Sequence, residues 1–166
     1  MKLILLILTV VMGQSVLAAD RNLIADPNVR KKVRASLENE YKPKKFKDEL
    51  SKADLAKVKS LHLETNPVSQ KITDESLAGL AHLSQLKFLY LSNTQITNMA
   101  LHKVAECKLL KVLALNNTQI DNRCIDQLIK LRKLTILKLE RTEVTKTGVA
   151  KLKKALPKCT IRSDHD

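Results

Sequence analysis

Histidine and cysteine are the side chains of this sequence best suited to ligate a metal or to act as nucleophiles, and their spacing fits neither role. The histidines are scattered, at His62, His82, His102 and His165. The cysteines are Cys107, Cys124 and Cys159, and their spacings of seventeen and thirty-five residues match no CxxC pair. A zinc site requires clustered thiolates or imidazoles. We therefore predict no metal site and no cofactor.

Catalysis is not predicted either. An active site needs a nucleophile beside a base, an acid–base pair or a metal cluster, and no such set occurs at a convincing spacing. The sequence has three glycines and no glycine-rich phosphate loop. The tail Asp164-His165-Asp166 is best interpreted as a solvated chain end rather than a metal site. We expect a protein that is not an enzyme.

A repeated unit accounts for most of the leucines. The frame Leu-x-x-Leu-x-Leu-x-x-Thr-x-(Ile/Val) starts at Leu86, Leu110 and Leu134, twenty-four residues apart. An earlier copy starts at Val58, with four extra residues around 66–70, and a partial fifth strand ends the array at 158–161. A period-two strand followed by a short helix, repeated in register, predicts an α/β leucine-rich-repeat solenoid. The expected sheet is short, parallel, curved and concave, with helices on the convex side.

Each unit also contains a predicted helix start and a column of apolar positions. The residue after the last strand anchor is Thr73, Thr97, Asp121 or Thr145, all good N-cap types. The apolar positions that follow are Leu77, Leu80 and Leu83; Leu101, Val104 and Cys107; Ile125, Leu128 and Leu131; and Val149, Leu152 and Ala155. Cys107 and Cys124 are accordingly interpreted as small buried hydrophobes.

Threonine occupies the position where each strand enters its turn, at Thr94, Thr118 and Thr142. A threonine hydroxyl both donates and accepts, so it can satisfy backbone groups of a turn. We expect these threonines to be structural and to bridge neighbouring turns.

The segment before the repeats reads as a helical cap. Asp26 precedes Pro27, which is an N-cap followed by proline at the first helical position. Val29, Val33 and Leu37 then mark one face, and Ser51-x-x-Asp54 is a capping box for a second helix leading to Leu55 and Val58. Between the helices, residues 41–47 form a basic connector. We assign residues 20–57 to the cap and 58–166 to the repeats, because an end repeat would otherwise expose an apolar edge.

The first nineteen residues read as a secretory signal. Lys2 precedes an apolar stretch from Leu3 to Met12, and small residues end the segment at Ala18 and Ala19. An apolar core of roughly ten residues is short for a membrane span, which needs about twenty. Residues 1–19 are thus predicted to be a signal peptide of a secreted or periplasmic protein. An uncleaved anchor is the alternative, and a membrane-spanning contact is expected only through it.

The repeat units resemble a known class. Ile72-Thr73-Asp74-Glu75-Ser76-Leu77 and the Leu-x-Leu-x-x-Thr-x-Ile-Thr units resemble bacterial exported leucine-rich-repeat proteins with cysteine-containing-type repeats, and residues 148–161 resemble the terminal unit of such proteins. Residues 26–30 and 50–55 are similar to the N-terminal helical cap of internalin-like proteins. The resemblance implies the fold and not the ligand. The same repeats resemble the substrate-recognition arrays of F-box proteins, a minor alternative because no F-box-like helical segment is present.

The register predicts which side chains face outward from the concave sheet. One column is Ser60, Phe88, Val112 and Ile136; the next is His62, Tyr90, Ala114 and Lys138; and a polar edge follows at Glu64, Ser92, Asn116 and Glu140. Aromatic and aliphatic residues rimmed by polar groups are typical of a protein interface. We predict a protein-binding site formed by Ser60, His62, Phe88, Tyr90, Val112, Asn116, Ile136 and Lys138. The alternative is that loops or a second copy cover this patch.

Charge supports a second binding hypothesis. The chain has a formal net charge of +13, and Lys59, Lys87 and Lys111 share one register position. Such a field favours polyanions, here an acidic surface polymer or an anionic membrane surface. With two Phe, two Tyr and no Trp, the chain has few side chains for base stacking, so no specific nucleic-acid binding is predicted. Salt separates the two hypotheses, because only the electrostatic one weakens steeply with ionic strength.

Overall fold

The structure is a computed structural model that describes residues 23–41, 50–64 and 71–165. It has a mixed α/β fold with one parallel sheet in the order β1-β2-β3-β4-β5. The strands are Ser60–His62 (β1), Phe88–Tyr90 (β2), Val112–Ala114 (β3), Ile136–Lys138 (β4) and Thr160–Arg162 (β5). The predicted signal segment, the connector after Tyr41 and the insertion in the first repeat lie outside the described residues.

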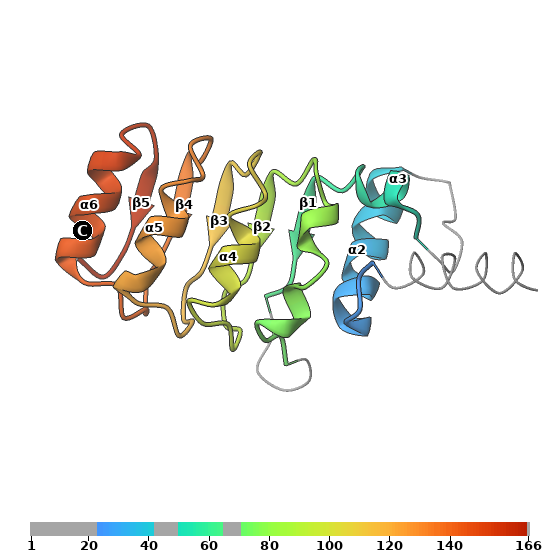
Figure 1. The fold of residues 1–166 in the computed structure, drawn as a ribbon, viewed down its shortest axis with the longest axis horizontal. Coiled ribbons are helices and arrows are strands. Elements are labelled where there is room, and N and C mark those ends of the chain that lie inside the picture. The colour runs from blue at the N-terminus through green and yellow to red at the C-terminus, as the bar shows by residue number, and fades with distance from the viewer. Residues whose placement is uncertain (1–22, 42–49, 65–70, 166) are drawn as a thin grey trace, which may run out of the picture.

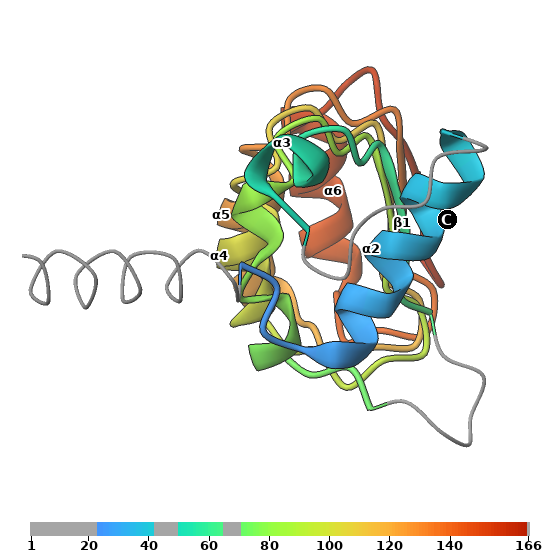
Figure 2. The ribbon, with the colours of Figure 1, turned by 90° about the vertical axis from the view of Figure 1, so that its right-hand side faces the viewer.

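Helical segments connect the strands and cover one face of the sheet. They are η1 (Glu75–Leu77), η2 (Leu80–His82), α4 (Ala100–Val104), η3 (Asn122–Cys124), α5 (Ile125–Leu128) and α6 (Lys146–Ala155). Two further helices, α2 (Pro27–Glu40) and α3 (Lys52–Leu55), precede β1 and lie at that end of the stack. Figure 1 shows the units stacked side by side along the long axis. Figure 2 looks along the stack, with α4 and α5 on one side and β1 on the other. The face of the sheet away from these helices is called the sheet face below.

The core is a set of aligned leucines between the sheet and the helical segments. Leu61, Leu89, Leu113 and Leu137 are register partners at the centre of their strands, and all four are fully buried. The helix columns behind them are buried as well, including Cys107 and Cys124. Each buried leucine contributes roughly 1.5–3 kcal/mol relative to an exposed one. The predicted strand register and the burial of both cysteines are therefore confirmed.

One predicted core residue is wrong. Ala155 is exposed, and Leu156 is buried in its place, behind Val149 and Leu152. The earlier units bury every third residue because their helical segments are 3-10 turns or helices of four or five residues. The last unit has a ten-residue α-helix. At 3.6 residues per turn, the position seven after Val149 returns to the core, and the position six after it does not.

The predicted helix starts are confirmed in two units. Asp121 caps η3 by accepting from the Arg123 amide at 2.8 Å. Thr145 caps α6 by accepting from the Gly148 amide at 3.4 Å. The Thr97 hydroxyl accepts from the Met99 amide at 3.2 Å, although the helix begins later, at Ala100. Thr73 does not cap, because its hydroxyl donates to Glu75 and η1 follows Asp74 without a side-chain cap.

The turn threonines are structural, but they do not bridge neighbouring units. Each hydroxyl donates to the carbonyl three residues earlier in its own unit, at 2.6 Å for Thr94 to Leu91 and Thr118 to Leu115, and at 2.7 Å for Thr142 to Leu139. Backbone bonds connect the turns instead: the Asn93 amide donates to the Asn116 carbonyl at 2.9 Å. The bridging prediction was wrong because each hydroxyl lies within hydrogen-bond distance of the carbonyl three residues earlier in its own unit.

Three turn residues adopt left-handed backbone conformations. Asn93, Asn117 and Arg141 have φ values of 59°, 53° and 56°. Asparagine tolerates this region, and the Asn117 side chain also donates to Asn93 Oδ1 at 3.0 Å. An arginine side chain is too long to stabilise the left-handed conformation by a local hydrogen bond of this kind. The backbone amide of Arg141 donates to Asp164 at 2.6 Å. The last full unit therefore retains a strained turn.

The N-terminal helices cover the β1 end of the stack. Asp26 caps α2 by accepting from the Asn28 and Val29 amides at 2.8 and 3.1 Å, and Ser51 and Asp54 form the predicted capping box. Val33 and Leu37 are buried against the first repeat. The Ser36 hydroxyl donates to the Ser60 carbonyl at 2.6 Å, which satisfies an acceptor at the edge of β1.

We predict that deleting residues 26–50 makes the protein aggregate or unfold, because the apolar side of the first repeat becomes exposed. Size-exclusion chromatography and thermal melting monitored by circular dichroism measure the effect. A soluble monomer that melts cooperatively would contradict the capping role.

We predict that Arg141→Asn raises the free energy of unfolding by about 1 kcal/mol, because asparagine relieves the left-handed strain at this position. Urea unfolding measures the change. Arg141→Ala is the control, since alanine keeps the strain and loses only the side chain. An equal gain in both variants would assign the effect to the arginine side chain rather than to the backbone.

Candidate binding surface

The sheet face carries the predicted columns in the predicted register. Ser60, Phe88, Val112, Ile136 and Thr160 are successive partners across the five strands. His62, Tyr90, Ala114, Lys138 and Arg162 form the parallel column beside them. A parallel sheet places such partners about 4.8 Å apart, so each column is a continuous strip of side chains.

The side chains of these columns are less exposed than the alternation of inward and outward residues along each strand suggests. Phe88, Val112 and Ile136 are half-buried, and Ala114 is buried at 3% exposure. Neighbouring side chains in a column shield each other, so the apolar side chains at the centre of the face are only partly exposed. The large exposed hydrophobic side chain among the described residues is Met99, at 73%, which lies away from this face and was not predicted as a site.

An aromatic pair marks the β1 end of the face. The rings of His62 and Tyr90 stack with centroids 4.3 Å apart and planes 12° from parallel. His62 also lies 3.3 Å from Glu64 Oε1 through Nδ1 and 3.2 Å from Ser60 Oγ through Nε2. The stack and both polar contacts hold the imidazole in one orientation, so Tyr90 presents a supported ring.

Asn116 and Glu140 lie just after strands β3 and β4 and are hydrogen-bonded to each other. Asn116 Oδ1 accepts from the Glu140 amide at 3.1 Å, which commits this oxygen to the neighbouring unit. Glu140 Oε2 is buried and accepts no hydrogen bond from the described part of the chain. Asn116 was predicted to contact a partner, and the structure gives it a structural role in addition. Lys138 is half-buried between them and the centre of the face.

The lysine column is in register but not uniformly available. The Lys87 amide donates to the Lys59 carbonyl and the Lys111 amide to the Lys87 carbonyl, both at 2.8 Å. Lys59 pairs with Glu40 of α2, which raises the pKa of the lysine, and its Nζ lies 5.7 Å from the Tyr41 ring centroid. The polyanion hypothesis included Lys59, whose ammonium group is paired with the Glu40 carboxylate at the end of α2.

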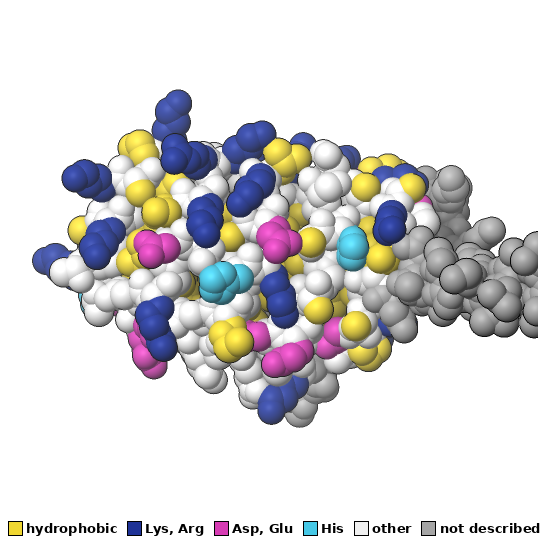
Figure 3. All heavy atoms as spheres, viewed as in Figure 1, with side chains coloured by type: hydrophobic (Ala, Val, Ile, Leu, Met, Phe, Trp, Pro, Cys, Tyr) yellow, Lys and Arg dark blue, Asp and Glu magenta, His cyan; other side chains and the backbone are white. Residues whose placement is uncertain are grey.

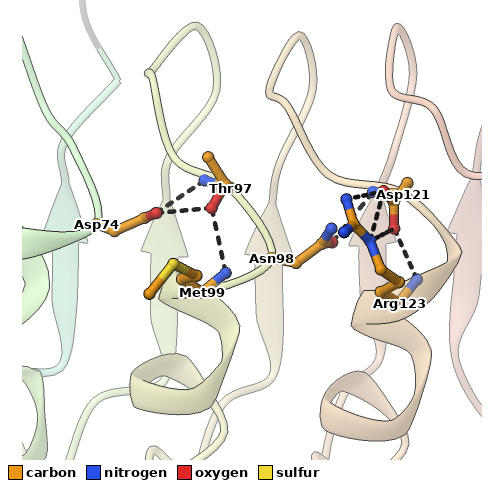
Figure 4. Close-up of polar contacts among 6 residues, drawn as sticks. All are labelled: Asp74, Thr97, Asn98, Met99, Asp121 and Arg123. Carbon is orange, nitrogen blue, oxygen red and sulfur yellow. Dashed lines mark hydrogen bonds and ion pairs between the residues drawn. The ribbon is translucent and has the colours of Figure 1, made fainter.

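Polar side chains join successive units at the points where the turns after the strands enter the helical segments (Figure 4). Asp74 accepts from the Thr97 amide at 2.8 Å and from its hydroxyl at 2.6 Å. Asn98 accepts from the Asp121 amide and Asn122 from the Thr145 amide, both at 3.1 Å. Sequence analysis missed these residues, although their 24-residue spacing directly after each predicted cap was a usable signal.

Asp121 is also bound by its own unit. Arg123 donates to both of its carboxylate oxygens, with the shortest contact 2.6 Å from Nη2 to Oδ2. These hydrogen bonds lower the pKa of Asp121 to about 2. The charged carboxylate therefore stays available as a helix cap, and the Asp121–Arg123 pair holds the start of η3.

The three cysteine thiols have raised pKa values in the folded protein. All three are free, and Cys107 and Cys124 are buried. Burial raises the pKa of both thiols to about 12, and the pKa of the half-buried Cys159 to about 11. Among the described residues, no group of three or more His, Cys, Asp or Glu side chains is placed to hold a metal ion. No described helix is long and apolar enough to cross a membrane.

Comparison with known proteins supports the fold. No protein-family model matches the sequence, and no curated protein resembles it significantly. The actin-binding site 2 of leiomodin-1 has a similar structure, with a TM-score of 0.50 and 15% identity over 68% of this chain and 73% of that one. At this identity the likeness is one of fold.

Two internalins of Listeria monocytogenes str. 4b F2365 are more distant in structure. Internalin C2 matches 86% of this chain and 85% of its own, with 18% identity and a TM-score of 0.40. A second internalin matches 68% of this chain but only 36% of its own, with 27% identity and a TM-score of 0.44. These TM-scores are too low to inform the function of this chain.

We predict that Cys107 and Cys124 do not react with Ellman's reagent at pH 8 in the native protein, because their pKa of about 12 leaves almost no thiolate. Cys159 reacts slowly, and all three react after denaturation in guanidinium chloride. The absorbance of released thionitrobenzoate counts the reactive thiols. Rapid native labelling in a Cys159→Ser variant would show that a core thiol is accessible.

Proposed function

We propose that this chain is a non-enzymatic leucine-rich-repeat scaffold that binds a protein partner on its sheet face, in a secreted or periplasmic location. The observation that carries the proposal is the strip of Phe88, Val112 and Ile136 in register, flanked by the His62–Tyr90 stack. Aromatic anchors dominate interface energies, and a supported ring loses little conformational freedom on binding.

Three features of the fold support a binding role. The strands hold the strip on backbone hydrogen bonds, so the surface is preorganised. Polar residues border the apolar centre, with Ser60 and His62 at the β1 end and Lys138 and Asn116 further along. The similar structure in leiomodin-1 is described as an actin-binding site, which is a protein-binding role; the likeness of fold does not extend the proposal to actin.

The location rests on the sequence. The signal-like residues 1–19 lie outside the described structure, and export is proposed from their pattern alone. The electrostatic alternative, through Lys87 and Lys111 with Lys59, would place an acidic polymer along one margin of the sheet face. The F-box-like alternative has no supporting contact in the structure.

We predict that the wild type captures a protein from the cell envelope that survives a high-salt wash, and that Phe88→Ala/Tyr90→Ala loses it. Loss of two central aromatic anchors lowers affinity by at least about tenfold. Met99→Ala is the matched control, because it removes an exposed apolar side chain away from the sheet face. Circular dichroism checks that each variant is folded.

A protein retained by wild type and Met99→Ala, but not by the double variant, supports the proposal. Capture that salt abolishes equally in all three proteins would contradict the apolar contact and favour the electrostatic alternative.

A further inference from the structure

The charged residues are divided between the two sets of turns. In the described turns that lead from a helical segment into a strand, nine basic residues stand against one acidic residue, Glu106. The nine are Lys57, Lys59, Lys87, Lys108, Lys111, Lys130, Arg132, Lys133 and Lys158. All these turns lie on one long edge of the stack, because the strands are parallel. We call this set the basic edge.

The opposite edge has the reverse sign. In the described turns that lead from a strand into a helical segment, counted through the first residue of that segment, and in the tail after β5, the basic residues are Lys71, Arg141 and Lys146. Seven acidic residues accompany them: Glu64, Asp74, Glu75, Asp121, Glu140, Glu143 and Asp164. Figure 3 shows Lys and Arg side chains along the upper edge of the molecule; the Asp and Glu side chains lie in the middle and lower part, where further Lys and Arg side chains also lie. The charge is therefore polarised across the stack.

Several cations of the basic edge are not neutralised within the protein. Lys59 pairs with Glu40 and Lys57 with Asp54. For Lys87, Lys111, Arg132, Lys133 and Lys158, the described residues supply no carboxylate within ion-pair distance, and all except Lys87 are exposed. Maintaining like charges in one row costs electrostatic energy, which an anionic surface would offset.

A shallow hollow opens on the same edge between the ends of α5 and α6. Its volume is about 460 Å³, and its lining is Asp126, Ile129, Lys130, Arg132 and Ala155. Two apolar side chains beside two cations match an amphiphile better than a fully polar polymer. Asp126 opposes an anion, so the row of lysines, rather than the hollow alone, must supply the attraction.

We propose that the basic edge docks this protein on an anionic lipid surface, with the acidic edge pointing away from it. A row of exposed cations along one edge can meet an anionic plane at several units at once, and the apolar side chains of the hollow fit an amphiphile better than a fully polar chain. The opposite sign of the other edge sets the orientation, since only one edge is attracted. The proposal is independent of the sheet-face site, which lies between the two edges.

The test is cosedimentation with vesicles of phosphatidylcholine, with or without phosphatidylglycerol. The protein is expressed from its full sequence and purified with the N-terminus that cells leave on it. Each lysine near an anionic surface strengthens binding by roughly fivefold. Lys111→Gln/Lys133→Gln/Lys158→Gln should therefore lower the partition coefficient by about a hundredfold.

The matched control neutralises the three basic residues of the other edge, as Lys71→Gln/Arg141→Gln/Lys146→Gln. It has the same net charge as the first variant, and we expect less than a threefold change. Phe88→Ala/Tyr90→Ala should bind vesicles as wild type does, which separates this proposal from the sheet-face site. Binding should vanish on neutral vesicles and weaken with salt.

Three results would overturn the proposal. Equal losses in both triple variants would assign binding to net charge rather than to an edge. Equal binding to neutral and anionic vesicles would assign it to apolar contact. Binding of soluble dextran sulfate in the absence of vesicle binding would assign the edge to a linear polyanion instead of a lipid surface.

Discussion

The structure depends on the in-register stacking of units that cannot bury their own apolar sides. Leu89 and its partners in the adjacent strands are buried only because each strand has a neighbour. Parallel pairing at a fixed offset also fixes the place of every other side chain in the unit. The inward leucines, the outward columns and the two rows of turns are consequences of this single constraint.

The same constraint makes the ends of the stack special. At the β1 end, α2 covers the first repeat, and its Ser36 hydroxyl occupies a carbonyl that no strand can reach. The Lys59–Glu40 pair adds a charged contact between the first strand margin and the end of α2. At the other end, β5 is three residues long with two exposed residues, Thr160 and Arg162. A short edge strand with a charged side chain discourages pairing with another chain.

Repetition also separates the surfaces that can act. The sheet face presents apolar and aromatic side chains, whereas the two rows of turns carry charges of opposite sign. Side-chain ladders such as Asp74 to Thr97 keep the turns in place. Because the surfaces lie on different elements of each unit, one face can bind a protein while one edge meets a charged surface. Under the two proposals made above, a protein bound on the sheet face has a defined orientation relative to the lipid surface.

The sequence alone determined the repeating strands and the buried columns of the core. The 24-residue period predicted the strands, their register, the buried leucines and cysteines and the outward columns, because a regular lattice places each residue by its position in the unit. The cap helices were predictable from local chemistry, since Asp26-Pro27 and Ser51-x-x-Asp54 act within a few residues. The lipid or protein partner is not encoded in this regularity.

Only the tertiary structure decided the features that break the lattice or join distant residues. Leu156 is buried in place of Ala155 because the helix of the last unit is longer than those of the other units. Lys59 forms an ion pair because Glu40 approaches it from a different element, α2. The half-burial of Phe88 depends on neighbours contributed by other strands. In the last two cases the deciding atoms are remote in the chain, and a periodic pattern carries information about position but not about which remote side chain fills the space beside it.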